Sequence, residues 1–338
     1  MVVEETVTTA ASRDLLLVLP GLGQARRCAG SMLPRLPAFE QLVARGDRGA
    51  SEDAPSVVML SRALPQLAGT EQLAAGPLSR LADTGRRDDA WWARADPVHL
   101  APVRDHLRLF AVEPLSMSEA GALAASCSDA LAAHGLALEA PNPDRWYVRA
   151  ARALQFTVGD PACSTGRDVY DLLPDGPDGA FARRVLTELQ MVMHDHPVNR
   201  ARERAGTPAV NSLWLWGGGM LPAAAPAYAL PGLRSDDPVL RGLWRYAGAA
   251  SDALPAQLVQ VTPGVILTRL CEAAALDADP AGCSALLERI EAQWLRPMLD
   301  ALRAGSIERV HAMLGSTGVY ALDRHGLRRW WRRARALE

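Results

Sequence analysis

Residues 14–23 read DLLLVLPGLG, a continuous apolar run that ends in a Pro/Gly turn. An apolar run without alternation is typical of a strand buried on both faces, as in a parallel sheet covered by helices. Further strand candidates are the shorter apolar runs at 57–60, 212–216, 258–261, 265–270 and 309–314. Helical patterns separate most of these runs, so the sequence predicts an α/β fold.

Four segments carry helical patterns. One covers 37–45, and another, 116–134, opens with Ser followed closely by Glu and ends at a glycine. A third covers 180–194. The clearest apolar stripe runs through 286–302, and we expect Pro297 to kink or restart that helix.

Two turn-rich segments suggest how the chain divides. LPDGPDG at 173–179 is a turn cluster, and the Pro/Ala-rich stretch 220–231 resembles a connector. With 338 residues and 49% hydrophobic content, the chain is long enough for two domains. We expect residues 1–89 and 221–338 to form a discontinuous α/β core, and 90–220 to form a smaller inserted α+β lobe.

Composition excludes several classes of function. The net charge of −2 gives no reason to expect nucleic acid or a membrane as a partner. All 36 basic residues are arginine, so Schiff-base chemistry and a lysine-containing phosphate loop are excluded. The five cysteines are too widely spaced for a zinc ribbon or a disulfide framework. The polar, acidic first residues do not resemble a signal peptide, and we expect a cytoplasmic protein.

The segment NSLWLWGGG, 211–219, is the most distinctive local feature. Gly217, Gly218 and Gly219 would let the backbone approach a ligand closely, and free N–H groups there could hold a phosphate or carboxylate. The alternative, which the pattern alone favours, is a tight strand exit packed under two tryptophans.

The segment HDHPVNRARERAG, 194–206, combines His, Asn and Arg. His194 and His196 point to nearly opposite sides of a helix, so a helix end with capping histidines is favoured over a metal pair. Arg202 and Arg204 could clamp an anion, although solvated surface arginines are the more common arrangement.

The segment ARADPVHLAPVRD, 93–105, places Arg94, Asp96, His99, Arg104 and Asp105 close together. A carboxylate beside a histidine can tune a general base. An Arg/Asp ion-pair network that holds a strand and turn is the favoured alternative.

The C-terminal segment RRWWRRARALE, 328–338, pairs aromatic residues with arginines. This mixture suits contact with a protein or an anionic surface. A docked terminal helix with its arginines in solvent fits the pattern equally well.

Taken together, these segments resemble the archaeal-type, cofactor-independent phosphoglycerate mutases. The resemblance covers about 90–220 well, through DLLPDGPDGAFARRVLTELQMVMHDHPVNRARERAGTPAVNSLWLWGGGMLP at 171–222, ARADPVHL, the SMSEA helix start and DRWYVR at 144–149. The matching positions are His196, Pro197, Val198, Asn199, Arg202, Asn211, Trp214, Leu215, Trp216, Gly217 and Gly219. Bacterial RpfE-type regulatory proteins are still more similar in ARADPVHL, HPVN and NSLWLWGGG.

The resemblance implies an alkaline-phosphatase-like, three-layer α/β core and a catalytic centre with two metals. Active members hold these metals with Asp and His ligands and use a Ser or Thr phosphoryl acceptor. This sequence departs from that pattern: Pro20-Gly21 replaces the first Asp-Gly, and Gly315-Ser316 replaces the late Asp-His. AALDADPAGC at 274–283 keeps Asp277 and Asp279 without a histidine, and His325 remains near the C-terminus.

The favoured interpretation is a non-catalytic regulatory protein that binds a phosphorylated metabolite or a protein partner, with no metal and no other cofactor. Its expected ligand-binding residues are Asn199, Arg202, Asn211, Gly217, Gly218, Gly219, Arg94, Asp96 and His99. One alternative is a phosphoglycerate mutase or phosphatase that binds Mn or Zn through rearranged ligands. Another is an interaction scaffold.

Overall fold

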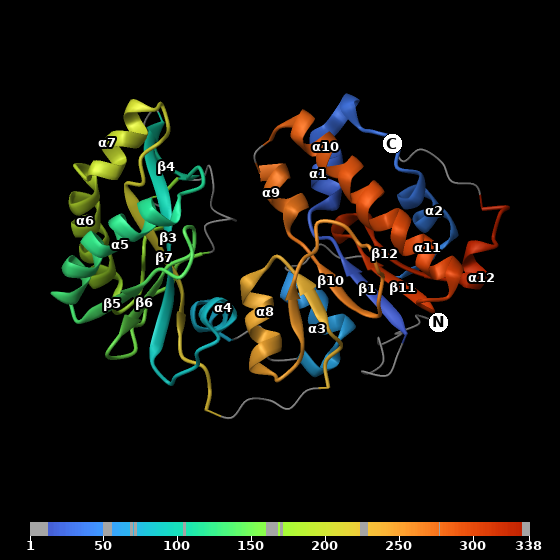
Figure 1. Ribbon diagram of the computed structural model, residues 1–338, viewed down its shortest axis with the longest axis horizontal. Coiled ribbons are helices and arrows are strands. Elements are labelled where there is room, and N and C mark those ends of the chain that lie inside the picture. The colour runs from blue at the N-terminus through green and yellow to red at the C-terminus, as the bar shows by residue number, and fades with distance from the viewer. Residues whose placement is uncertain are drawn as a thin grey trace. The chain divides into compact units, whose positions relative to one another are not determined.

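The computed structural model describes residues 13–49, 56–67, 70, 73–103, 106–159, 168–169, 172–223, 229–276 and 278–332 (Figure 1). These fall into two compact units, one built from both ends of the chain (1–71 and 226–338) and one from 72–225. The predicted boundaries were 90 and 220. The second unit starts earlier because helix α4 (Ala75–Thr84) packs against its strands.

The first unit is an α/β core around a seven-stranded sheet, so the predicted α/β class is confirmed. The strand order is β2-β12-β11-β1-β10-β8-β9, in which β11, β1, β10, β8 and β9 are parallel and β12 is antiparallel to both of its neighbours. The strands are β1 (Asp14–Val18), β2 (Asp47–Gly49), β8 (Leu233–Ser235), β9 (Ser251–Ala253), β10 (Gly264–Leu267), β11 (Arg309–Met313) and β12 (Val319–Asp323). The helices are α1 (Leu22–Ala29), α2 (Pro37–Arg45), α3 (Ser56–Ala63), α8 (Pro238–Tyr246), α9 (Leu270–Leu276), α10 (Pro280–Ile290), α11 (Arg296–Ala304) and α12 (Arg324–Leu327).

Strand β1 lies in the middle of this sheet and is buried on both faces, as its apolar run predicts. Leu15 and Leu17 point into a cluster with α1, α2, α10 and α11, while Leu16 and Val18 point to the opposite face. Figure 1 shows α1, α10 and α11 on one side of the sheet and α3 and α8 on the other. The core therefore has three layers.

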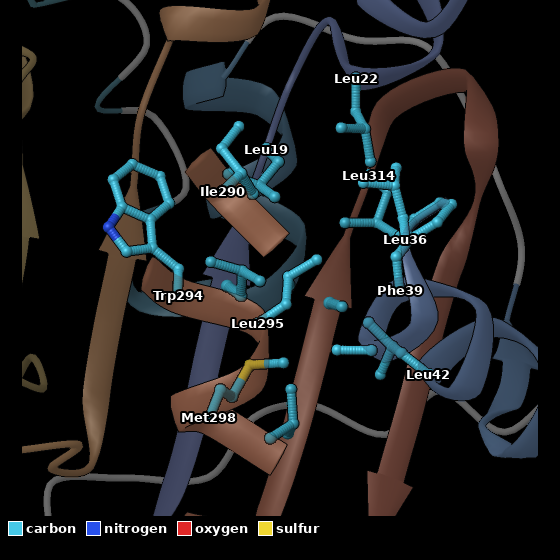
Figure 2. Close-up of a cluster of buried hydrophobic side chains, with 14 of the residues drawn as sticks. Leu19, Leu22, Leu36, Phe39, Leu42, Ile290, Trp294, Leu295, Met298 and Leu314 are labelled. Atoms are coloured by element: carbon cyan, nitrogen blue, oxygen red, sulfur yellow. The ribbon is translucent and has the colours of Figure 1, made fainter. Parts of the chain in front are cut away.

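The C-terminal helical segment breaks where its proline indicates. Helix α10 passes into one π-helical turn, Glu291–Leu295, before α11 begins, with Pro297 in the first turn of α11. The turn directs Trp294, Leu295 and Met298 into the cluster of Figure 2. Glu291 accepts hydrogen bonds from the backbone of Ala38 and Phe39 (2.7 and 3.1 Å), so the same turn caps α2.

Two of the predicted strands in this unit are wrong. Residues 57–60 belong to helix α3, because a short apolar run fits a buried helix as well as a strand. Residues 258–261 form no strand: Leu258 is buried, but the neighbouring Val259 is 84% exposed.

The second unit is an α+β lobe with a five-stranded antiparallel sheet. The strand order is β4-β3-β6-β5, and β7 also pairs with β3. The strands are β3 (Trp91–Val103), β4 (His106–Ala111), β5 (Leu136–Glu139), β6 (Tyr147–Ala150) and β7 (Ser212–Gly219), and the helices besides α4 are α5 (Met117–Ala132), α6 (Gly179–His194) and α7 (Pro197–Arg204). Helices α5 and α6 cover one face of the sheet, whose core includes Trp91, Leu123, Val185 and Leu213.

The helix starts of the lobe follow the sequence signals. Ser116 and Glu119 form a reciprocal capping box at the start of α5, as predicted. His196 caps α7 through its ring nitrogen, which accepts from Val198 N at 3.2 Å. Among the described residues, no helix combines the length and the apolar character needed to cross a bilayer.

Candidate functional site

Arg94 and Asp96 form a buried ion pair on β3. Arg94 approaches the Asp96 carboxylate at 2.7 Å, and Trp216 on the paired strand β7 donates an indole hydrogen bond of 2.7 Å to the same carboxylate. Burial is the largest single influence on Arg94 and lowers its pKa, but the charge of Asp96, the nearby Tyr147 and the hydrogen bond to Asp96 together outweigh it, so the pKa is raised. The predicted Arg/Asp pairing on a strand is therefore confirmed for Arg94 and Asp96, whereas Arg104 and Asp105 lie outside the described residues.

His99 and Asn211 hold the far half of β3 to the segment before β7. The His99 ring contacts the carbonyl oxygen of Ala209 at 2.8 Å. The Asn211 amide bonds both backbone groups of Leu100, accepting from its N–H at 2.7 Å and donating to its carbonyl at 2.8 Å. Asn211 therefore extends the ladder at the point where β7 begins.

Asn199 and Arg202, both on α7, are buried and bonded to backbone groups. Asn199 donates to the carbonyls of Met193 and Val210 at 2.7 Å and accepts from Val210 N at 2.8 Å. Arg202 donates to the carbonyls of Pro208 (3.0 Å) and Glu113 (3.1 Å). The HPVN motif and its following arginine thus fasten α7 to the end of α6 and to the segments that precede α5 and β7.

The glycines of β7 allow close packing. A Cβ on Gly218 would lie 2.2 Å from the Trp91 ring, and one on Gly219 would lie 2.4 Å from Cβ of Ala74. Gly217 has φ +62° and lies against Ala75 at the start of α4. The packing alternative accounts for the glycine run.

The structure thus gives internal partners to all nine residues predicted to bind a ligand. Ligand binding by them stays a prediction, since internal bonding by itself explains why these residue types occur here. The polar residues of the core present a different arrangement.

The carboxyl ends of β8, β10, β1 and β11 lie side by side in the core sheet, and polar residues follow three of them. In open α/β sheets, ligands bind outside this edge. The residues concerned, here named the carboxyl-edge cluster, are Asp236, Thr268, Arg269, Glu272 and Ser316. Sequence reasoning missed the first four, although a polar residue directly after an apolar strand is a usable signal.

Asp236 and Thr268 link two neighbouring strand ends. The Thr268 hydroxyl, which is fully buried, donates to Asp236 Oδ2 at 2.6 Å and also accepts from Leu270 N at 3.2 Å. Desolvation raises the pKa of Asp236, and the neighbouring charge of Asp237 adds to this, whereas the bond from Thr268 acts in the opposite direction.

Arg269 lies between acidic groups. Its Nε donates to Glu272 at 2.8 Å, and its Nη1 lies 4.0 Å from the Asp237 carboxylate, which caps α8. Two carboxylates thus hold the guanidinium at the end of β10.

The turn after β1 places two glycines, Gly21 and Gly23, against this cluster. Gly21 has φ +77°, and a Cβ there would lie 2.6 Å from Glu272 N, so only glycine fits. A Cβ on Gly23 would lie 2.5 Å from Ser316 Oγ. The start of α1, the 3₁₀ turn Gly315–Thr317 and the start of α9 therefore converge here.

Comparison with known proteins links a segment of this chain to one enzyme family. A segment of 88 residues is 34% identical to the 2,3-bisphosphoglycerate-independent phosphoglycerate mutase of Methanosarcina mazei, covering 25% of this chain and 22% of the relative. A probable enzyme of the same name from Geobacter sulfurreducens is 32% identical over 78 residues, 23% of this chain and 20% of the relative. This chain is homologous to the cofactor-independent phosphoglycerate mutases.

The homologous segment spans about a fifth of the length of these mutases. No family model matches the chain. The solved cofactor-independent phosphoglycerate mutase of Thermoplasma acidophilum aligns with 94% of this chain and 90% of its own at TM-score 0.42 and 17% identity. A Pyrococcus horikoshii protein aligns with 91% of this chain and 84% of its own at TM-score 0.49 and 15% identity.

The described residues do not fit the two-metal centre that the resemblance to the mutases implies. Among them, no group of three or more His, Cys, Asp and Glu side chains is arranged to hold a metal ion. Pro20, which has no side-chain donor atom, lies in the turn after β1, and Gly315 and Ser316 follow β11. Asp279 caps α10 by accepting from Ala281 N and Gly282 N, and Asp277 lies outside the described residues.

The two core histidines lie away from the carboxyl edge. His311 is within β11, and its Nε2 is 3.6 Å from a carboxylate oxygen of Asp14, the first residue of β1. His325 is on α12, which follows β12. Because β12 is antiparallel to β11, with Asp323 opposite Arg309, α12 begins at the amino edge of the parallel strands. Neither residue can complete a mutase metal site among the described residues.

Proposed function

We propose that this chain is a non-catalytic relative of the phosphoglycerate mutases, of the bacterial RpfE-type regulatory kind, that binds a small phosphorylated metabolite in the cytoplasm. One observation carries the proposal: the strand ends that would hold catalytic metals carry Pro20, Gly315 and an arginine held by carboxylates. Phosphoryl transfer in the mutases requires paired cations to stabilise the migrating group.

Arg269 is the cation of the carboxyl-edge cluster, and the proposed anionic ligand would bind through it. The side chain of Arg269 is 29% exposed. Its planar guanidinium can donate two parallel hydrogen bonds to a phosphate or a carboxylate. The hydroxyl of Ser316 lies against Gly23 in the first turn of α1, whose helix dipole favours negative charge. The curated relatives are named for phosphoglycerate, which makes it the first ligand to test.

The test is isothermal titration of 3-phosphoglycerate and of inorganic phosphate into the wild type, Arg269→Ala and Arg13→Ala. Arg13 is a matched control because it is an exposed arginine that precedes the same sheet at the amino end of β1. We expect Arg269→Ala to weaken 3-phosphoglycerate binding at least tenfold, and Arg13→Ala to bind as the wild type does. Equal affinity of all three proteins would remove the site.

The enzymatic alternative predicts a different result in the same preparation. A rearranged mutase or phosphatase would contain stoichiometric Mn or Zn, and a chelator would abolish its turnover. Elemental analysis together with a manganese-supplemented mutase assay separates the two hypotheses, since the proposed regulator shows neither bound metal nor turnover.

A further inference from the structure

Two arginines anchor the C-terminal segment of the described chain to the turn between α2 and β2. Arg329 pairs with both carboxylate oxygens of Asp47 and donates to the carbonyl of Arg45 at 3.1 Å. Arg332 reaches the Gly46 carbonyl and the Asp47 carboxylate, each at 3.4 Å. These contacts enclose Trp330 and Trp331, so both tryptophans are held between anchored neighbours.

Trp330 and Trp331, here named the tryptophan pair, point into solvent. They are 76% and 63% exposed, and their rings meet edge to face with centroids 6.1 Å apart. They are the only exposed tryptophans in the part of the chain that the structure describes. Because Arg329 and Arg332 anchor the segment that carries the indoles, less backbone entropy is lost on binding than for a free segment, and exposed tryptophans are frequent interface hot spots.

The surroundings of the tryptophan pair are basic. Arg328 and Arg332 flank the pair and are exposed, and Arg48, also exposed, follows Asp47. Two described carboxylates lie near this anchor: Asp47 is already paired with Arg329 and Arg332, and Asp323, which caps α12, also interacts with the charge of Arg329. A chain with a net charge of −2 therefore carries a local positive surface around two exposed indoles.

We propose that the tryptophan pair is a docking surface for an acidic protein segment that also carries apolar side chains. The indoles would bury the apolar side chains, and Arg328, Arg332 and Arg48 would face the carboxylates. The surface lies at the amino edge of the sheet, where β12 ends, opposite the carboxyl-edge cluster. It therefore goes beyond the proposed ligand site and does not depend on it.

The test uses the full chain and two fluorescein-labelled peptides of equal length. One peptide contains Glu, Asp and Leu, and the other has Lys at every acidic position. By fluorescence anisotropy, we expect the acidic peptide to bind the wild type, and the lysine peptide and the double variant Trp330→Ala/Trp331→Ala to lose at least tenfold in affinity. Raising the salt concentration should weaken the acidic complex further.

The matched control is the double variant Met32→Ala/Val259→Ala, which truncates two other exposed apolar side chains of the same unit. It should bind the acidic peptide as the wild type does, and all variants should show the wild-type thermal transition. Absence of acidic-peptide binding, or unchanged binding by the tryptophan variant, overturns the proposal. So does tryptophan-dependent binding to phosphatidylserine vesicles, or tryptophan-dependent self-association in sedimentation, without peptide binding.

Discussion

Thr268 Oγ1 donates a 2.6 Å hydrogen bond to Oδ2 of Asp236, and this bond joins the ends of the adjacent parallel strands β10 and β8. Neither residue belongs to a strand, yet together they fix the two loops that leave this edge of the sheet. The same loops carry Arg269 and Asp237, so the bond also sets the spacing of the charged groups of the carboxyl-edge cluster.

Removing this hydroxyl should destabilise the core. Thr268→Val keeps the shape of a fully buried side chain but leaves Leu270 N–H and the Asp236 carboxylate without that partner. We expect a loss of about 1–2 kcal/mol in the free energy of unfolding from urea titration. Thr268→Ser, which retains the hydroxyl, should lose less, and equal stability of the valine and serine variants would contradict this role.

The arginine of the HPVN segment should prove structural. Arg202 is buried and bonded to two carbonyl oxygens, so Arg202→Ala should cost about 2–4 kcal/mol of unfolding free energy. Arg204, on the same helix, is exposed, and its Nε donates to the carbonyl of Arg200 one turn earlier. Arg204→Ala should stay within about 0.5 kcal/mol of the wild type in the same denaturation experiment.

The capping box of α5 should make the lobe acid-sensitive. Hydrogen bonds from the backbone and side chain of Ser116 lower the pKa of Glu119 below its ordinary 4.5. The ionised carboxylate therefore adds stability that is present above pH 4.5 and is lost as the pH falls through the lowered pKa. Hydrogen exchange at the start of α5 should accelerate in this acid range in the wild type, whereas Glu119→Gln should show a smaller dependence on pH.

Ser116→Ala tests the other half of the box. Loss of the hydroxyl that accepts from Glu119 N should cost about 1 kcal/mol at neutral pH, measured as faster exchange of the first-turn amides of α5. Unchanged exchange in Ser116→Ala would mean that water replaces the cap without loss.

The cysteines should differ sharply in reactivity. Burial raises the pKa of Cys127 and of Cys271 to about 12, so almost none of either thiol is ionised at pH 8. Cys28 is only half-buried. Peptide mass spectrometry after iodoacetamide treatment at pH 8 should find Cys28 modified before Cys127 and Cys271, which should react only in denaturant. Equal rates in the folded protein would show that the core opens readily.

The elements that follow a single periodic pattern were predictable from the sequence. Strand β1 is a continuous apolar run, α2 matches its expected bounds of 37–45, and α5 begins at its capping box. Each of these elements depends on local contacts or on the burial of one face, and both can be predicted from the pattern of residue types.

Strand β3 is missing from the predicted apolar strands, and only the ion-pair interpretation placed a strand there, because its charged residues conceal it. Arg94 and Asp96 neutralise each other within the strand, and Pro97 lies among paired residues, so neither apolar alternation nor a lack of proline marks its course. Strand β7, which pairs with this part of β3, lies more than a hundred residues later in the chain, so the local sequence does not reveal the pairing.

The site was harder to predict because its members are chemically ordinary. Asp236, Thr268 and Ser316 become a group only when parallel strands bring their loops together, and no spacing in the sequence encodes that. The sequence prediction placed the ligand site in the conspicuous motifs HPVN and WLWGGG instead. Side chains of these motifs form hydrogen bonds within the lobe.

The central position of β1 has a consequence for biosynthesis. Its neighbours on either side, β10 and β11, are translated long after it. Strand β1 therefore leaves the ribosome before either of its pairing strands has been made. Residues 72–225 form a compact unit of their own and can fold during that interval. A nascent chain stalled before β10 should therefore expose LLLV to chaperones while the later unit is already resistant to protease.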